Sequence, residues 1–152
     1  MTSASPHGIR MIDVGDKPVS RRTARATARL RASPESIRRI LAGELAKGDA
    51  VATARIAGIM AAKRTSDLIP LCHPLPLESV EISVSSDTPA TILVEASVTA
   101  TARTGVEMEA LCAATAAALA IYDMTKSIDR GMTIEQVRLE SKTGGTRGDY
   151  SR

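Results

Sequence analysis

Alternation of apolar and polar residues predicts the strands of this chain of 152 residues. Between residues 24 and 31, Ala and Leu alternate with Arg and Thr, and a period of two residues is typical of a strand with one buried face. The same alternation recurs over residues 80–85 and 92–100. An Asp-Thr-Pro turn separates these two segments, which therefore predict a hairpin. A shorter apolar pattern at residues 137–139 predicts a last strand.

Three segments with helical spacing lie between the predicted strands. The first, residues 34–41, follows Ser33, which can cap a helix, and precedes Gly43, a typical stop. The second, residues 49–64, is so rich in Ala and Gly that another element can approach it closely. The longest, residues 106–129, ends before a glycine.

Prolines at near-alternate positions separate the second helix from the hairpin. In the segment DLIPLCHPLPL, residues 67–77, the prolines lack N–H donors and restrict their predecessors to extended geometry. We therefore expect a rigid loop there, neither helix nor central strand. The order strand, helix, helix, strand, strand, helix, strand predicts an α+β domain whose helices pack on one face of an antiparallel sheet.

Length and composition favour a single domain, residues 1–152, with about residues 1–9 disordered and about 142–152 a mobile basic tail. There is no Phe or Trp and there are only two Tyr, so base-stacking platforms for nucleic acid are nearly lacking. The net charge of +3 is mild and suits a polyanionic small molecule as well as nucleic acid. No apolar run reaches the ~18 residues of a membrane span, and no secretory leader is recognised. We therefore expect a cytoplasmic protein that binds neither membrane nor nucleic acid.

The proline-rich loop holds the first candidate for chemistry, Cys72-His73. A stiff backbone can hold the imidazole, or nearby N–H groups, in place. The alternative is a histidine that only bonds a backbone carbonyl. A zinc site is disfavoured, because the remaining Cys and His are Cys112 and His7, in a predicted disordered terminus. Two cysteines are also too few for a disulfide framework or a four-thiolate cluster, and no metal is expected.

The long predicted helix carries Asp123 and Lys126 on one face, at i and i+3. The alternative is a surface ion pair worth about 0–1 kcal/mol. Glu109 lies 14 residues earlier, about 21 Å along the axis, so Glu109 and Asp123 of one chain cannot hold the same small ligand. Lys47 precedes a helix, whose N-terminus favours anions. Lys142 opens a glycine-rich tail that either clamps phosphate or is simply solvated.

Four stretches of the chain carry long signatures: MIDVGDKPVSRRTARA, KGDAVATARIAGIMAAKRTSDLIPLCHPL, TGVEMEALCAATAAALAIYDMTKSID and VRLESKTGGTRGDY. Together they closely resemble the cyclic pyranopterin monophosphate synthase family of molybdenum cofactor biosynthesis, called the MoaC family. The resemblance covers about residues 11–150. It implies a lyase that rearranges a 3′,8-cyclised dihydro-GTP to cyclic pyranopterin monophosphate and releases diphosphate. This reaction has no redox step, so no cofactor is expected.

The resemblance also implies roles for individual residues. Asp123 matches the catalytic aspartate, with Lys126 beside it, and Lys47 and Lys142 match lysines of catalysis or triphosphate binding. The matched substrate-binding residues are Leu71, Cys72, His73, Met108, Glu109 and Lys142. A carboxylate and a lysine can exchange protons if burial and mutual charge bring their pKa values toward neutrality.

The family resemblance implies a homohexamer, a trimer of dimers, built from ferredoxin-like protomers. It agrees with the helix spacing: if Glu109 and Asp123 serve one substrate, they come from different subunits with antiparallel long helices. An alanine-rich face would let such helices pack closely: Ala113, Ala114, Ala116, Ala117, Ala118 and Ala120. Glu107 lies about 200° from Glu109 on a helix, so we expect only Glu109 to face the pocket.

Two places differ from the usual pattern of the family. Arg103 precedes TGVEM where a lysine is usual, and Thr146-Arg147 stand where some relatives have a basic residue followed by Ser. Both keep positive charge. The rival function is a ferredoxin-like module that binds a nucleotide without converting it, but such a module needs no acid–base pair.

Overall fold

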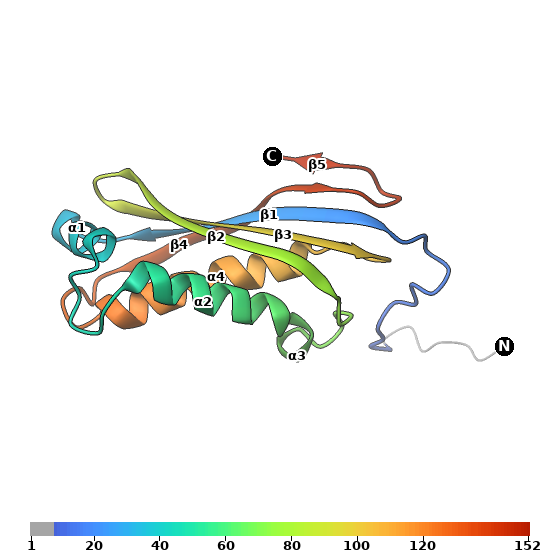
Figure 1. Cartoon of the computed structure of the whole chain (residues 1–152), viewed down its shortest axis with the longest axis horizontal. Helices are drawn as coiled ribbons and strands as arrows, with labels where there is room; N and C mark the ends of the chain where they lie inside the picture. The colour runs from blue at the N-terminus through green and yellow to red at the C-terminus, as the bar shows by residue number, and fades with distance from the viewer. Residues whose placement is uncertain (1–7) are drawn as a thin grey trace.

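A five-stranded antiparallel sheet forms one layer of the computed structural model, which describes residues 8–152 (Figure 1). Its order is β2-β3-β1-β4-β5. The strands are β1 (Ser20–Arg31), β2 (Leu77–Thr88), β3 (Thr91–Ala102), β4 (Thr133–Thr143) and β5 (Tyr150–Ser151). The helices are α1 (Pro34–Ala42), α2 (Ala50–Lys63), α3 (Thr65–Leu68) and α4 (Glu107–Thr125). Residues 1–7 of the segment expected to be disordered lie outside the described residues.

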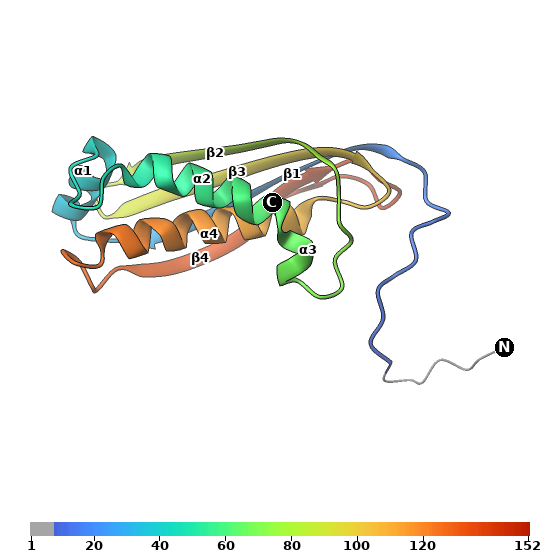
Figure 2. The ribbon, with the colours of Figure 1, turned by 60° about the horizontal axis from the view of Figure 1, so that its bottom comes forward.

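The arrangement confirms the predicted fold class. Helices α2 and α4 lie side by side on one face of the sheet (Figures 1 and 2). Without the short α1, α3 and β5, the chain order is strand, helix, strand, strand, helix, strand, and every strand pair is antiparallel. That order, with β1 and β3 central, is the ferredoxin-like α+β fold.

Strand β1 shows why the alternation of apolar and polar residues predicts a strand, and why it misses the first residues of that strand. Ala24, Ala26, Ala28 and Leu30 face the helices and are fully buried. The strand nevertheless begins at Ser20, four residues before the apolar pattern. Arg22 occupies the buried face there, because its guanidinium donates to the carbonyls of Ala102 and Arg103. A satisfied polar side chain thus extends the strand beyond its apolar residues.

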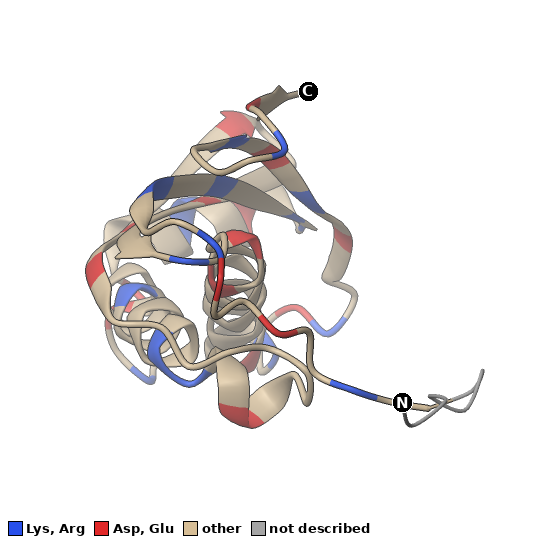
Figure 3. Cartoon of the chain, turned by 90° about the vertical axis from the view of Figure 1, so that its right-hand side faces the viewer, with Lys and Arg blue, Asp and Glu red and all other residues tan. Residues whose placement is uncertain are grey.

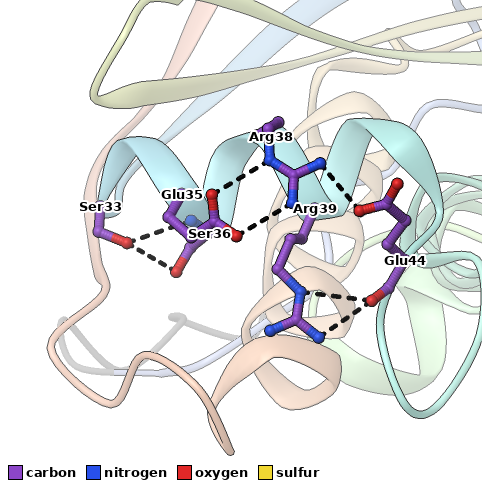
Figure 4. Close-up of polar contacts among 6 residues, drawn as sticks. All are labelled: Ser33, Glu35, Ser36, Arg38, Arg39 and Glu44. Atoms are coloured by element: carbon purple, nitrogen blue, oxygen red, sulfur yellow. Dashed lines mark hydrogen bonds and ion pairs between the residues drawn. The ribbon is translucent and has the colours of Figure 1, made fainter.

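Local capping confirms the first predicted helix (Figure 4). Ser33 Oγ accepts from the Ser36 N–H at 3.1 Å, and α1 ends at Gly43. From the last turn of the helix, Arg39 donates to the backbone carbonyl of Glu44, which lies beyond the helix. This network lies at the opposite end of the molecule from the N-terminal end of α4 (Figure 1).

Helices α2 and α4 approach closely because Gly58 faces the contact. A Cβ on Gly58 would lie 2.8 Å from Ile82 Cδ1 and 3.1 Å from the Ala113 carbonyl oxygen. On α4, four of the six alanines expected at a subunit interface are fully buried within the chain, Ala113, Ala114, Ala117 and Ala118. The expectation that this face serves helix packing between subunits is therefore wrong for those four, which α2 and the sheet already cover.

Other boundaries also differ from prediction. Helix α4 ends at Thr125 rather than 129; a turn follows, and the Asp129 carboxylate beyond it accepts from the Ser33 N–H at 2.9 Å. Helix α3 includes Asp67 and Leu68, and the Cys72 N–H then closes a turn by donating to the Ile69 carbonyl at 3.1 Å. The segment without helix, turn or strand therefore covers only residues 72–76. Beyond Lys142 the chain ends β4 and returns to pair with it as β5; mobility of this tail stays a prediction.

Candidate active site

A cavity of about 450 Å³ opens at the end of the sheet where α4 begins. Its walls come from the proline-rich loop, the first turn of α4, the end of β4 and the segment before β1. All six residues predicted to bind substrate line it: Leu71, Cys72, His73, Met108, Glu109 and Lys142. Figure 3 views the molecule from this end, where segments bearing basic and acidic residues converge.

Basic side chains predominate in the cavity. The lining includes Lys17, Arg22, Arg103, Lys142 and Arg147, against the acidic Glu107 and Glu109. Lys142 Nζ lies 3.0 Å from Glu107 Oε1, which ties β4 to the start of α4. Five cations against two carboxylates give the walls a positive balance that favours an anionic ligand.

Arg22 is a cavity residue that the motifs did not identify. Its side chain is nearly buried, with 7% of its surface exposed, and it donates from Nε to the Ala102 carbonyl and from Nη2 to the Arg103 carbonyl. Gly145, at φ 94°, lies directly against the guanidinium, and a Cβ there would clash with Nη1. The signal was present in the sequence: an arginine two residues before Ala24, on the face that is otherwise apolar.

Glu109 is the buried acid of the cavity, with 4% of its surface exposed. Burial raises its pKa, and the neighbouring Glu107 carboxylate raises it further, against the lowering effect of its own backbone N–H. Burial also raises the pKa of the Cys72 thiol, with additional contributions from Glu109 and Cys112. Cys72 is therefore a neutral thiol in this cavity, and Glu109 holds a proton more readily than an exposed glutamate does.

Both glutamates at the start of α4 line the cavity, so the expectation that only Glu109 would face it is wrong. The 200° separation assumed two side chains pointing straight out from a helix. Glu107 is the first residue of α4, and its carboxylate folds back beside Gly105.

The three residues predicted to be catalytic gather at the other end of α4. Asp123 Oδ2 lies 2.9 Å from Lys47 Nζ, and Asp123 Oδ1 lies 2.7 Å from Lys126 Nζ. Lys47 comes from the connection between α1 and α2. Within one chain this cluster is about 21 Å along the helix from Glu109, as the residue spacing predicted.

The isolated chain does not meet the condition for proton exchange within this cluster, which is that the pKa values of the carboxylate and the lysine approach neutrality. Hydrogen bonds from Lys126 and Lys47 lower the pKa of Asp123 to about 2, and Asp123 raises the pKa of Lys126. The side chains of Asp123 and both lysines are about half exposed, so desolvation does little to oppose these shifts. In the isolated chain, the Asp123 carboxylate and the Lys126 ammonium are therefore both charged.

Among residues 8–152, no helix is both long and apolar enough to cross a bilayer. Within the same range, no three His, Cys, Asp or Glu side chains are grouped so that they could hold a metal ion.

A ferredoxin-like chain with a basic cavity and a separate Asp–Lys cluster defines an enzyme-like α+β protein whose cavity suits an anionic ligand. The model of the MoaC family matches residues 11–145 of the chain. The chain therefore belongs to the MoaC family. The chain is thus an enzyme, as the resemblance implied.

Curated relatives span nearly the whole chain. It is 60% identical over 141 residues to the cyclic pyranopterin monophosphate synthase of Herpetosiphon aurantiacus, covering 92% of this chain and 86% of that protein. It is 53% identical over 144 residues to that of Thermomicrobium roseum, covering 94% and 87%. It is 52% identical over 143 residues to cyclic pyranopterin monophosphate synthase 3 of Mycobacterium bovis, covering 94% and 81%.

Proposed function

We propose that this chain converts (8S)-3′,8-cyclo-7,8-dihydroguanosine 5′-triphosphate into cyclic pyranopterin monophosphate and diphosphate, a lyase reaction of molybdenum cofactor biosynthesis. The relatives at 52–60% identity are named as synthases of this product. A cavity lined by five Lys and Arg side chains suits a substrate that carries a triphosphate. The proposed compartment is the cytoplasm. The scarcity of aromatic residues favours a small molecule over nucleic acid as the partner.

The separation of two groups of side chains along α4 is the observation that carries the mechanism. The cavity lies at the start of the helix and the Asp123 cluster lies at its end. No single small substrate reaches both ends within one chain. We therefore place the reaction at an interface, where the long helices of two copies run antiparallel and each cavity faces the other copy's Asp123 cluster. A homohexamer made as a trimer of dimers would contain such pairs.

The basic walls act on the triphosphate. When a sugar hydroxyl attacks the α-phosphorus, the bond to the diphosphate breaks and negative charge grows on the leaving group. Lys142 can stabilise that charge, and Lys17 and Arg22 can hold the triphosphate to the same extent before and during the reaction.

Proton transfers accompany the ring rearrangement. Glu109, whose pKa is raised by burial, can carry a proton inside the cavity. Asp123 and Lys126 can exchange protons with the substrate once a second copy covers them. Burial raises the pKa of a carboxylate and lowers that of an ammonium, which moves the exposed pair toward the working range.

A mixing experiment tests the shared site. Asp123→Ala and Glu109→Ala chains are each purified, partly unfolded, mixed in equal amounts and refolded, and diphosphate release from the cyclised substrate is measured. Random pairing makes half of the pairs mixed, with one of two sites intact in each, so about a quarter of wild-type activity is expected. Each variant refolded alone is the control. A mixture no more active than its parents would reject the shared site.

The same assay separates this function from a binding-only module. A nucleotide-binding module would retain the cyclised substrate in equilibrium dialysis without releasing diphosphate. The proposed enzyme releases one diphosphate for each substrate consumed.

A further inference from the structure

The segment before β1 closes one side of the cavity. Ile12, Val14 and Lys17 from this segment line the cavity. Locally it is a turn: the Gly15 N–H donates to Asp13 Oδ1 at 2.8 Å, and the Lys17 N–H donates to the Val14 carbonyl at 3.0 Å. These bonds shape the turn but do not hold it to the sheet or the helices.

Arg103 attaches this turn to the remainder of the chain. Its Nη1 donates to the Gly15 carbonyl at 2.6 Å and to the Lys17 carbonyl at 2.7 Å. In the part of the chain that the structure describes, these are the two hydrogen bonds that join residues 8–19 to any later residue. The backbone of Arg103 is itself fixed, since its carbonyl accepts from Arg22 Nη2 at 3.1 Å.

We propose that Arg103 is a positioning residue, which holds the turn at residues 13–17 against the cavity so that the Lys17 ammonium meets the anionic part of the substrate. The inference rests on the proposed function for the identity of that anion. One nitrogen of Arg103 donates to two carbonyls inside the turn, those of Gly15 and Lys17, so the position of the turn depends on this side chain. A guanidinium keeps its charge beside Lys17 and Arg22, and hydrogen bonds to a charged donor are stronger than neutral ones.

Hydrogen exchange in the free protein tests the attachment itself. Arg103→Met should raise the exchange rates of the Gly15 and Lys17 amides about tenfold or more, as loss of charged hydrogen bonds opens the turn. Arg103→Lys should restore much of the protection, since an ammonium can still reach a carbonyl. Arg39→Met is the matched control: it removes an arginine that binds a backbone carbonyl outside the cavity, and it should leave these amides unchanged. Unaltered exchange in a folded Arg103→Met protein would overturn the proposal.

A double-mutant cycle tests whether Arg103 acts through Lys17. Arg103→Met and Lys17→Met should each raise KM about tenfold with kcat changed less than threefold, and the double variant should be no worse than Lys17→Met. Effects that multiply would mean that Arg103 contacts the substrate directly and would refute a positioning role. If the wild type releases no diphosphate, the proposed function fails. In that case two measurements still test the positioning role of Arg103. One is the exchange experiment, and the other is the affinity for inorganic diphosphate, which should fall in both single variants.

Discussion

Lys47 Nζ lies 2.9 Å from Asp123 Oδ2, although 76 residues separate the two in the chain. Lys126 occupies the other carboxylate oxygen at 2.7 Å. Each oxygen of Asp123 therefore has its own ammonium, which the i, i+3 spacing of Asp123 and Lys126 could not produce alone. The connection between α1 and α2 delivers the second cation to the end of α4.

Replacing the central carboxylate should separate activity from stability. Asp123→Asn is expected to lower kcat by about 10²–10⁴-fold, the usual contribution of a positioned acid or base. Its urea unfolding midpoint should barely change, because exposed ion pairs contribute little to stability. Glu35→Gln, which removes an exposed carboxylate paired with Arg38, is the control and should alter neither. Diphosphate release above a tenth of wild type would contradict a role for Asp123 in proton transfer.

The buried acid of the cavity should make stability depend on pH. Since burial raises the pKa of Glu109, the folded protein binds this proton more tightly than the unfolded chain does. The stabilisation is complete below the ordinary pKa of a glutamic acid and is lost as the pH rises through the raised pKa. Glu109→Gln carries no charge at any pH, so the free energy of unfolding of the wild type should fall relative to this variant across that window.

Urea unfolding at a series of pH values measures this difference. Glu35→Gln should show the opposite dependence of stability on pH, because Arg38 lowers the pKa of Glu35. For this pair, the wild type should lose stability relative to the variant as the pH falls. A wild-type minus Glu109→Gln difference that stays constant with pH would show that Glu109 is not buried as an acid.

The strands could be predicted because one sheet face is buried and the other is not. Alternation located the cores of β1, β2 and β3, but the ends depended on contacts between distant residues. Arg22 lengthens β1 through a carbonyl 80 residues away, and Asp129, just beyond α4, is bonded to the N–H of Ser33, 96 residues earlier. Such contacts leave no periodic signal.

The sequence predicted which residues line the candidate site, but it did not predict their ionisation or the segments around them. The motifs identified Glu109 and His73, which line the cavity. They could not show that Asp123 is fully charged in the isolated chain, because that depends on solvent exposure and on Lys47. They also missed the turn at residues 13–17, whose position depends on one arginine side chain.

A side chain at Gly58 should destabilise the contact between α2 and α4. Gly58→Val forces Cβ into Ile82 and the Ala113 carbonyl, and overpacking of this kind costs about 1–3 kcal/mol. Gly131→Ala is a suitable control, since a Cβ there meets only the Asp129 carboxylate at an ordinary 3.6 Å. Thermal or urea unfolding gives both values. Equal stabilities of the two variants would show that α2 can shift away from α4 at little cost.

The turn after β4 offers a test of Arg22 that does not alter Arg22. Gly145 and Gly148 both have positive φ, 94° and 77°, so alanine strains the backbone at either position. Only at Gly145 would the new Cβ also strike the Arg22 guanidinium; at Gly148 it meets nothing within 4 Å. Gly145→Ala should therefore raise KM for the cyclised substrate about tenfold or more, since displacing a buried cation weakens the hold on the triphosphate. Gly148→Ala should lose stability by a similar amount but keep the KM of the wild type. Steady-state kinetics with both variants measures the difference. If the KM values of both variants rise together, Arg22 has no role in holding the substrate.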